Sequence, residues 1–513
     1  MNRFLVNDGG ATATRAARAQ AASRDASWDL VVIGGGATGL GVAVQAAAQG
    51  YQTLLLEAAD FAAGTSSRST KLLHGGVRYL AQGHLGLVRD ALHERETVIR
   101  NAPSLAHPLS FVLPTYRWRD GWMYRLGLRA YEWLAGSSSL GPTRWLNAEL
   151  AKRHSPELES TGLCGLVTYW DGQFDDAGLA LSLARTAERL GAVVLNHSPV
   201  QSVETRQGHG HEVRWRDAQG GAEHVAQARC VVNAAGGWLD RLRSPHLPPS
   251  ITLSRGTHVV VDRAFWPHEH GMIIPRTQDG RVLFVLPWQG HALLGTTDVP
   301  CDTVTMHPRA DPQEVSFILQ EADRYLVRSP QWSDITSMWS GLRSLMKPDG
   351  MSHTPTRNIG REHAIWKDPD GMVCVAGGKW TTYRLMAEQT VAFCRDAGLL
   401  AAETALISTR HLALDCPQPA MWDHLQGAGR VLAPGVTEAF VRWCVRVAQA
   451  CTVEDVLARR SRLLLVDARG ARQVAPEVAD IMHLEGVEDP GLDRFMALTS
   501  EYLPDPGWLN GMT

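Results

Sequence analysis

The order of apolar and polar positions near the N-terminus predicts a strand, a glycine turn, a helix and a second strand. The apolar run 30–33 is followed by Gly34, after which small and apolar residues predominate. A second apolar run, 53–56, ends at Glu57. Short apolar runs bounded by turn residues are typical of buried parallel strands. The stretch 29–57 is therefore predicted to form a βαβ unit.

The turn of this unit carries a G-x-G-x-x-G pattern, formed by Gly34, Gly36 and Gly39. The first glycine allows a tight turn, the second lets the backbone approach a pyrophosphate, and the third lets the helix pack closely on the strand. The helix N-terminus, which includes Thr38, offers N–H groups and a positive dipole end to phosphates. The acidic Glu57 can accept a ribose hydroxyl and argues against a 2′-phosphate. These features leave FAD and NAD as candidates.

The pattern changes farther along the chain. Between 251 and 299, short β-rich runs recur at regular spacing and predict an antiparallel sheet. After about residue 400 the apolar positions recur mainly at helical spacing, as in 452–467 and 474–484. The chain is therefore predicted to combine an α/β Rossmann-like domain, an antiparallel β-rich domain and a C-terminal α-helical domain.

The composition excludes several classes of protein. Among 513 residues, 50 Lys and Arg and 53 Asp and Glu give a net charge of −3, so no nucleic-acid partner is expected. The eight cysteines are scattered without a C-x-x-C pair, which indicates neither disulfides nor a zinc or iron–sulfur site and favours a reducing compartment. The histidine pairs at 209/211 and 268/270 lack the spacing of zinc ligands, so no metal is predicted.

Two segments bear on localisation. Residues 1–27 lack the apolar core of a secretory signal and are interpreted as an N-terminal tail, loose or helical, with an organelle transit peptide as the alternative. The segment 114–135 is either a helix pair that packs aromatic residues into the core or a basic–aromatic surface that lies on a membrane. Its arginines and aromatic residues alternate: Arg117, Trp118, Arg119, Trp122, Tyr124, Arg125, Arg129, Tyr131 and Trp133.

Further motifs follow predicted strands. The stretch 64–80, GTSSRSTKLLHGGVRYL, comes directly after the second strand and is expected to face the dinucleotide. The stretches 230–238, CVVNAAGGW, and 371–384, GMVCVAGGKWTTYR, each run from an apolar strand into glycines, which lets the backbone approach a ligand. The second of them then begins a helix, a geometry that suits anions. A basic cluster occupies 339–361.

Five motifs in this order resemble the FAD-dependent, quinone-linked glycerol-3-phosphate dehydrogenase family, within the amino-acid-oxidase-like flavoproteins. They are VIGGGATGLG, GTSSRSTKLLHGGVRYL, VLPWQGHALLGTTD, WSGLRSL and GGKWTTYR. The resemblance covers about residues 28–485. It implies an FAD-dependent oxidoreductase region over 28–400 and a helical domain over 401–513. Within that region it implies FAD-binding segments of about 28–110, 175–245 and 340–400, and a β-rich substrate domain of about 246–339.

The resemblance also implies that FAD is the cofactor and that residues from these three segments hold it. The expected contacts are Gly34, Gly36, Thr38, Gly39, Glu57, Thr65, Ser66, Ser67, Lys71, Leu73, His74, Gly75, Val200, Ala235, Gly236, Trp238, Gly378, Lys379, Thr381 and Thr382.

The reaction that the resemblance implies is oxidation of sn-glycerol 3-phosphate to dihydroxyacetone phosphate. Hydride passes from C2 to FAD, and the electrons go on to membrane quinone. Arg343 and Arg357 correspond to arginines that hold the substrate phosphate, for which guanidinium groups offer bidentate geometry. Arg78, Tyr79 and Lys379 resemble the remaining substrate contacts.

The expected catalytic residues are His258, Arg343 and Lys379. His258 is the first candidate for the base that accepts the C2 hydroxyl proton, since histidine exchanges protons near neutral pH. The alternative is a strand histidine that only fills a hydrogen-bonding role. Two positions depart from the family pattern, because Gly237 and Ser344 stand where the family usually has proline.

Several alternatives share these motifs. An oxygen-using glycerol-3-phosphate oxidase would usually carry an inserted segment, and no long insertion is evident here. An amine or 2-hydroxy-acid oxidase on the same fold would not need the basic cluster. A non-catalytic flavin-binding redox sensor would need neither the basic cluster nor the LHGG loop. The expected partners are glycerol 3-phosphate, membrane quinone and a second copy of the chain in a homodimer. The expected location is cytoplasmic, peripheral on the cytoplasmic face of the inner membrane.

Overall fold

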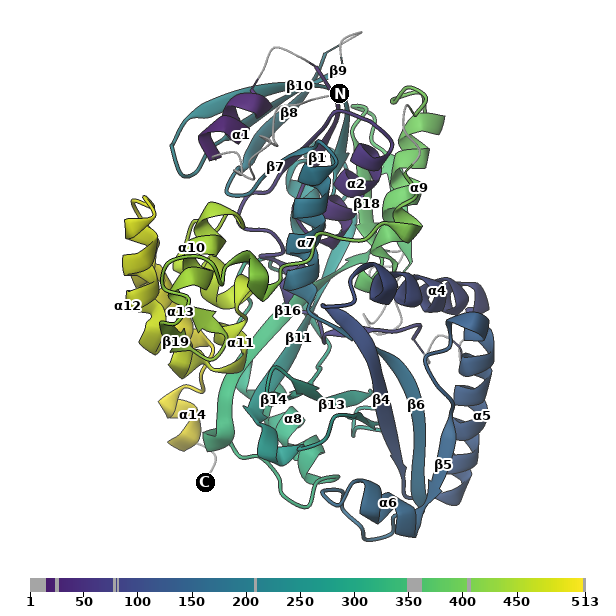
Figure 1. The fold of residues 1–513 in the computed structure, drawn as a ribbon. Helices are drawn as coiled ribbons and strands as arrows, with labels where there is room; N and C mark the ends of the chain where they lie inside the picture. The colour runs from purple at the N-terminus through teal and green to yellow at the C-terminus, as the bar shows by residue number, and fades with distance from the viewer. Residues whose placement is uncertain are drawn as a thin grey trace.

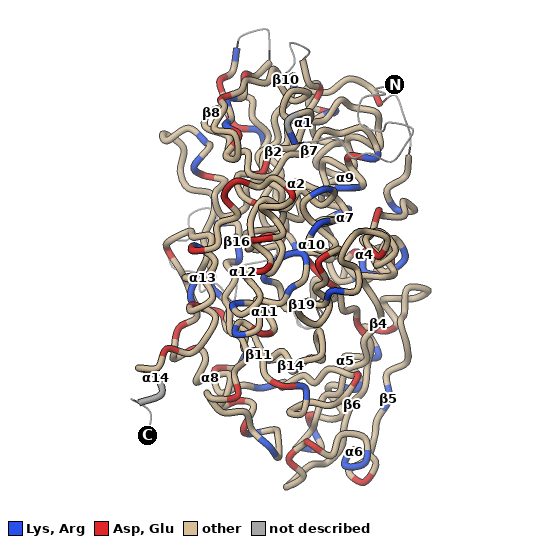
Figure 2. The backbone as a smooth tube through the Cα atoms, turned by 60° about the vertical axis from the view of Figure 1, so that its left-hand side comes forward, with Lys and Arg blue, Asp and Glu red and all other residues tan. Residues whose placement is uncertain are grey.

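The computed structural model of the protein describes residues 15–23, 27–76, 80, 83–206, 210–347, 362–403 and 407–510. Two large sheets lie end to end and a helical domain packs beside them (Figure 1). Lys and Arg are interspersed with Asp and Glu over the fold, in agreement with a net charge near zero (Figure 2). Among the described residues, no helix combines the length and the apolar character needed to cross a bilayer.

The first sheet has eight strands and contains the predicted βαβ unit. Its path is β17 (His363–Lys367), β18 (Val373–Gly377), β10 (Glu223–Asn233), β1 (Trp28–Ile33), β2 (Thr53–Leu56) and β7 (Val193–Leu195), and β9 (Gly210–Arg216) and β8 (Val200–Arg206) extend from β10. From β18 to β7 the strands are parallel.

Two cores cover the faces of this sheet. Leu30 and Val32 of β1 pack with three helices, whereas Val31 and Ile33 point to the opposite core, because side chains alternate along a strand. The three helices are α2 (Ala37–Ala48), α7 (Asp176–Arg189) and α9 (Tyr383–Asp396). The opposite core includes α1 (Arg15–Ala22), so part of the predicted N-terminal tail is a packed helix.

The second sheet has ten strands and is largely antiparallel. Its path is β15 (Val299–Cys301), β11 (Ile251–Asp262), β14 (His291–Gly295), β13 (Leu283–Trp288), β12 (Gly271–Ile274), β4 (Ala106–Thr115), β6 (Gly165–Phe174) and β3 (Leu72–Leu73), with β16 (Ile335–Met346) beside β11 and β5 (Arg144–Asn147) beside β6.

The range 246–339 predicted for the β-rich domain is therefore too narrow. Strands β3, β4, β5 and β6 join the same sheet from the N-terminal half, and β16 continues past residue 339. These strands pair with partners far away in sequence, and such pairing leaves no local period that a sequence pattern could reveal.

Helices cover both faces of the second sheet. Val259 and Val261 pack toward α8 (Pro312–Asp323). Val260 points the other way, toward the core that includes α4 (Leu85–Asn101) and α5 (Trp118–Ala135). A short helix, α6 (Ala148–His154), follows β5. The segment 114–135 is thus a strand end followed by one helix, rather than a helix pair.

The C-terminal domain is helical, as predicted. It consists of α10 (Glu438–Arg446), α11 (Leu463–Val466), α12 (Ala468–Leu484), α13 (Leu492–Glu501) and α14 (Pro506–Asn510), with a small hairpin of β19 (Val431–Ala433) and β20 (Val436–Thr437). Its predicted start at residue 401 is too early, because the chain after residue 401 still packs on the preceding region, residues 28–400. There the Ile407 N–H donates to the Ala48 carbonyl oxygen, and the Leu414 N–H donates to the Asn101 carbonyl oxygen.

The predicted helix 452–467 is wrong as a single regular helix. Residues Asp455–Arg460 form a π-helical turn, and Arg462 adopts a left-handed backbone with φ of 67° before α11 begins. Non-glycine residues seldom adopt this conformation, so surrounding contacts must hold Arg462 there.

A buried ion pair joins α4 to α9, and it gives the first prediction. Arg384 Nη2 lies 2.7 Å from Glu94 Oε1, and the two side chains are 5% and 3% exposed. Removing one partner leaves a buried charge unpaired, which costs about 3–5 kcal/mol. Arg384→Ala should therefore lower the midpoint of urea unfolding clearly. Arg153→Ala, which breaks an exposed pair with Glu149, should leave that midpoint almost unchanged. Equal midpoints for the two variants would contradict this assignment.

Candidate active site

The glycine turn after β1 has the geometry that a dinucleotide requires. Gly34 has φ of +110°, and a Cβ added at Gly39 would lie 1.9 Å from the Gly34 carbonyl oxygen. A side chain at Gly39 would therefore push α2 away from β1. Gly36 begins α2 without a side-chain cap, and the Ala37 N–H donates to Ser66 Oγ at 2.9 Å. Backbone N–H groups at the uncapped end of this 12-residue helix suit a pyrophosphate.

Glu57 occupies the position expected for a ribose contact. Its carboxylate accepts hydrogen bonds from the Gly35 N–H at 2.5 Å and the Ala59 N–H at 2.8 Å. Burial raises the pKa of Glu57, and these two bonds oppose that shift. Each carboxylate oxygen has more than one acceptor site, so a ribose hydroxyl can still bind. Val200, another expected cofactor contact, begins β8 two residues after Ser198, whose N–H donates to the Glu57 carbonyl oxygen.

The motif 64–76 connects this turn to the third glycine motif. Ser66 accepts from Ala37 through Oγ and from the Trp380 indole through its carbonyl oxygen, the latter at 2.8 Å. The His74 N–H donates to Thr381 Oγ1 at 3.2 Å. The structure thus brings together three of the segments that sequence reasoning assigned to the cofactor. Gly378 and Thr382 lie in the last of them, while Leu73 lies in β3.

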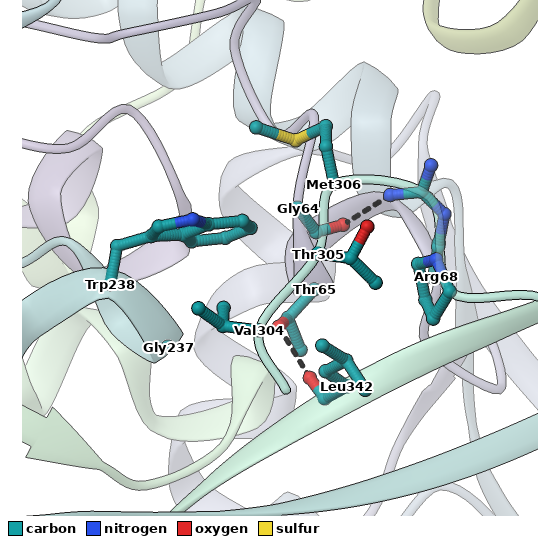
Figure 3. Close-up of a pocket in the computed structure, with 10 residues that line it drawn as sticks. Gly64, Thr65, Arg68, Gly237, Trp238, Val304, Thr305, Met306 and Leu342 are labelled. Carbon is teal, nitrogen blue, oxygen red and sulfur yellow. Dashed lines mark hydrogen bonds between the residues drawn. The ribbon is translucent and has the colours of Figure 1, made fainter. Parts of the chain in front are cut away.

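A small recess lies between this motif and the end of β10 (Figure 3). Ala235, Gly236 and Trp238 lie just beyond β10, and the Trp238 ring faces Gly64, where an added Cβ would lie 3.2 Å from it. Thr65 Oγ1 donates to the Leu342 carbonyl oxygen and ties the motif to β16 (Figure 3).

The two departures from the family pattern are neighbours in space. A Cβ added at Gly237 would lie 3.4 Å from Ser344 Oγ. The turn after β10, which carries Gly237, therefore packs against β16, which carries Ser344.

Strands β11 and β16 present His258 and Arg343 on one face. His258 pairs across the strands with Trp339 and Ser254 pairs with Arg343, while Gly256 pairs with Gly341 between them. Side chains that pair directly across two strands share a face of the sheet. The glycine pair therefore leaves the floor between the histidine and the arginine without side chains of its own, and Arg68 packs against Gly341 there.

Arg343 lies over this floor. A Cβ added at Gly256 would lie 2.4 Å from Arg343 Nη2. The guanidinium donates through Nη1 to the Thr297 carbonyl oxygen at 3.0 Å and through Nη2 to Thr296 Oγ1 at 3.1 Å. These contacts fix the plane of the guanidinium, as bidentate recognition of an anion requires.

His258 is buried. Its ring is stacked on Trp339 with centroids 4.2 Å apart, and Gly295 lies so close on the neighbouring strand that an added Cβ would come within 2.5 Å of the imidazole. Nε2 lies 3.0 Å from Thr70 Oγ1, and Nδ1 has no hydrogen-bond partner among the described residues. Burial lowers the pKa of His258 well below its usual range, and the charges of Lys71 and Arg343 add to this shift. When Nε2–H donates to Thr70, Nδ1 carries the lone pair that could accept a proton.

Lys71 is held differently from what its place in the motif suggested. Its ammonium is fully buried, lies 2.7 Å from Asp176 Oδ2, and donates to the Ser67 carbonyl oxygen at 2.7 Å. Burial lowers the pKa of Lys71 to about 7, and Asp176 opposes that shift. A direct contact of Lys71 with the cofactor stays a prediction. Sequence reasoning missed Asp176, for which two adjacent aspartates at the start of a helix were the available signal.

Lys379 follows β18, and its charge is close enough to Asp171 to affect the pKa of that carboxyl group. Burial raises the pKa of Asp171, and Arg95, Tyr131 and Lys379 each oppose that shift. The Tyr131 hydroxyl donates to Asp171 at 2.9 Å and accepts from the Gly75 N–H at 2.7 Å. This cluster fixes the end of the motif 64–76, and the sequence pattern gave no indication of it.

Three predicted substrate residues, Arg78, Tyr79 and Arg357, lie outside the described residues. The roles of all the predicted site residues in binding cofactor or substrate stay predictions. Of those that are described, His258 and Arg343 lie in the antiparallel sheet, and Gly34 and Glu57 follow strands of the parallel sheet.

Comparison with known proteins agrees with this geometry. Residues 29–392 match the family of FAD dependent oxidoreductases, and residues 421–486 match the C-terminal domain of alpha-glycerophosphate oxidase. The mitochondrial glycerol-3-phosphate dehydrogenase of Mus musculus is 35% identical over 89% of this chain and 70% of its own length. Its counterpart in Arabidopsis thaliana is 35% identical over 89% of this chain and 82% of its own length.

Solved structures give the same result. The glycerol-3-phosphate dehydrogenase from Bacillus halodurans complexed with FAD has a TM-score of 0.73, with 27% identity over 96% of this chain and 98% of that one. An L-alpha-glycerophosphate oxidase from Mycoplasma pneumoniae, at 15% identity and a TM-score of 0.58, shares the fold. The cofactor is FAD, and the chain belongs to the FAD-dependent glycerol-3-phosphate dehydrogenase family.

Proposed function

We propose that the protein oxidises sn-glycerol 3-phosphate to dihydroxyacetone phosphate. The observation that carries this proposal is the position of Arg343 and His258 on one face of the antiparallel sheet, next to a dinucleotide turn. FAD supplies the hydride acceptor for C2 of the substrate. The protein has to hold the phosphate, orient C2 and accept the proton of the C2 hydroxyl.

The phosphate would be held by Arg343, with Arg357 and Lys379 as further cationic contacts and Arg78 and Tyr79 beside them. The bonds of Arg343 to Thr296 and Thr297 support this role, because they orient the guanidinium before substrate arrives. A fixed cation loses little side-chain entropy when the dianion binds.

The hydroxyl proton would pass to His258. Burial lowers the pKa of this imidazole and so favours its neutral form, which has a lone pair for the proton. The positive charge that forms on the ring would lie against the face of Trp339, where a cation–π interaction stabilises it.

Helix α5 supports peripheral attachment to a membrane, where quinone would accept the electrons. Trp118, Trp122, Leu126 and Trp133 lie on one side of the helix and are 63%, 66%, 74% and 80% exposed. Arg129 is exposed on the same side. Helix α5 lies at the outer edge of the molecule (Figure 1), and basic and aromatic residues on one helix face suit the interface of an anionic bilayer. A homodimer and a location on the cytoplasmic face of the inner membrane belong to the same proposal.

The proposed reaction is tested by mixing the holoenzyme anaerobically with sn-glycerol 3-phosphate and following the flavin absorbance. We expect bleaching that a soluble quinone reverses. Arg343→Ala should raise the concentration for half-maximal bleaching about 10- to 100-fold, since a charge-assisted hydrogen bond contributes about 1.5–3 kcal/mol. The exposed Arg328→Ala should behave like wild type. A flavin that stays oxidised would refute the proposed substrate, and recovery with oxygen alone would identify an oxidase.

The role of His258 is tested with His258→Gln, which can still reach Thr70 but does not accept a proton near neutral pH. The rate constant for flavin reduction at saturating substrate should fall about 10²- to 10⁴-fold. His291→Gln, in strand β14 of the same sheet, serves as the matched control. If both variants reduce flavin at the wild-type rate, His258 is a strand histidine with a hydrogen-bonding role.

Membrane attachment is tested by co-sedimentation with vesicles of three parts phosphatidylcholine and one part phosphatidylglycerol. Leu126→Ser and the charge reversal of Arg125 and Arg129 should each lower the bound fraction, because one removes apolar contact and the other electrostatic attraction. Leu484→Ser is the matched control, since Leu484 is 73% exposed but lies in the C-terminal domain. Equal binding of all variants would exclude α5 as the contact surface.

A further inference from the structure

The C-terminal domain directs three buried arginines out of its own core. Arg459 Nε lies 2.6 Å from Asp60 Oδ2, and Arg460 Nη1 lies 2.7 Å from the same oxygen. Arg462 Nη2 donates to the Ser67 carbonyl oxygen and to Asp176 Oδ1, both at 2.8 Å. The first two arginines thus join the domains at Asp60, whereas Arg462 reaches the cofactor-facing motif itself.

We propose that Arg462 is a positioning residue, through which the C-terminal domain sets the place of the segment Ser67–Lys71 between the cofactor turn and His258. This inference rests on the proposed function, because it assigns the C-terminal domain a part in that reaction.

The local backbone is shaped to deliver this side chain. Arg462 has a left-handed backbone, follows the π-helical turn Asp455–Arg460, and is 1% exposed. A regular helix through 452–467 would turn the side chain elsewhere. The irregular conformation is retained because the guanidinium completes a buried set of charges, which would be costly if it were left incomplete.

One carboxylate holds both domains. Asp176 Oδ1 accepts from Arg462, while Oδ2 accepts from Lys71 Nζ at 2.7 Å and from Ser69 Oγ at 2.7 Å. Asp175 Oδ1 lies 3.6 Å from Arg462 Nε and adds a second negative charge to the two cations. Arg462 and Lys71 also share the Ser67 carbonyl oxygen as an acceptor. The segment is therefore held at Ser67, Ser69 and Lys71, at Ser67 by Arg462 itself and at the other two by the carboxylate that Arg462 pairs with.

The same segment touches both halves of the active site. Ser66, its neighbour, accepts from Ala37 at the start of α2. Thr70 Oγ1 lies 3.0 Å from His258 Nε2, and Lys71 Nζ lies 4.6 Å from the centre of the Trp339 ring that stacks on His258. Loss of Arg462 would free the segment to move, and His258 would lose its fixed orientation.

The chain contains a matched control. Arg460 also crosses the domain boundary and is fully buried, but it bonds to Asp60 and to the Ala448 carbonyl oxygen rather than to Ser67–Lys71. Arg460→Met therefore weakens the domain contact without releasing the segment beside His258.

The test compares Arg462→Met with Arg460→Met in the holoenzyme. Both variants should lower the midpoint of urea unfolding. Only Arg462→Met should lower the rate of flavin reduction by sn-glycerol 3-phosphate, at least 10-fold at saturating substrate, and only this variant should raise the dissociation constant for FAD several-fold. Because Arg462 acts through His258, the double variant Arg462→Met/His258→Gln should reduce flavin no more slowly than His258→Gln alone.

Equal reduction rates and equal FAD dissociation constants for the two methionine variants would overturn the inference, as would additive losses in the double variant. If Arg462→Met does not fold, Arg462→Gln takes its place, since its shorter, uncharged side chain cannot form the ion pair with Asp176. If wild-type flavin is not reduced by the substrate, the proposed function fails, and the FAD dissociation constants still decide whether Arg462 positions the segment.

Discussion

The carboxylate of Asp176 is the constraint on which the rest of the structure depends. It lies at the start of α7, and it binds a lysine of the cofactor-facing motif and an arginine of the C-terminal domain with no access to water. A buried charge is tolerated only with its partners in place, so the three regions have to assemble together. The π-helical turn before Arg462 and the buried position of Lys71 follow from this requirement.

The residues proposed for the active site come from elements that are remote in sequence. The glycine turn and Glu57 follow strands of the parallel sheet, and His258 and Arg343 lie in the antiparallel sheet. The motif 64–76 lies between them and bonds to both. The chemistry therefore depends on how this short motif is fixed, by Trp380 and Thr381 at one place and by Asp176 at another.

The features that the sequence pattern predicted well are those set by neighbouring residues. The turn from Gly34 to Gly39, the buried strands beside it and Glu57 all follow from local spacing. That β4 and β6 belong to the second sheet could not be predicted, because β4 pairs with β12 and β6 pairs with β4 across long stretches of sequence. The helix expected over 452–467 was wrong because long-range ion pairs outweighed local helical preference. Asp176 and Trp339 were missed for the same reason, since their partners are brought to them by the fold.

Two glycines of the antiparallel sheet shape the site because they have no side chain. At Gly256 one methyl group would occupy the place of the Arg343 guanidinium, and at Gly295 it would occupy the place of the imidazole. Neither glycine has a positive φ, so backbone conformation does not demand glycine at these positions. The volume of the neighbouring side chains alone therefore excludes any larger residue at these two positions. The proposed site thus depends on residues that take no chemical part in the reaction.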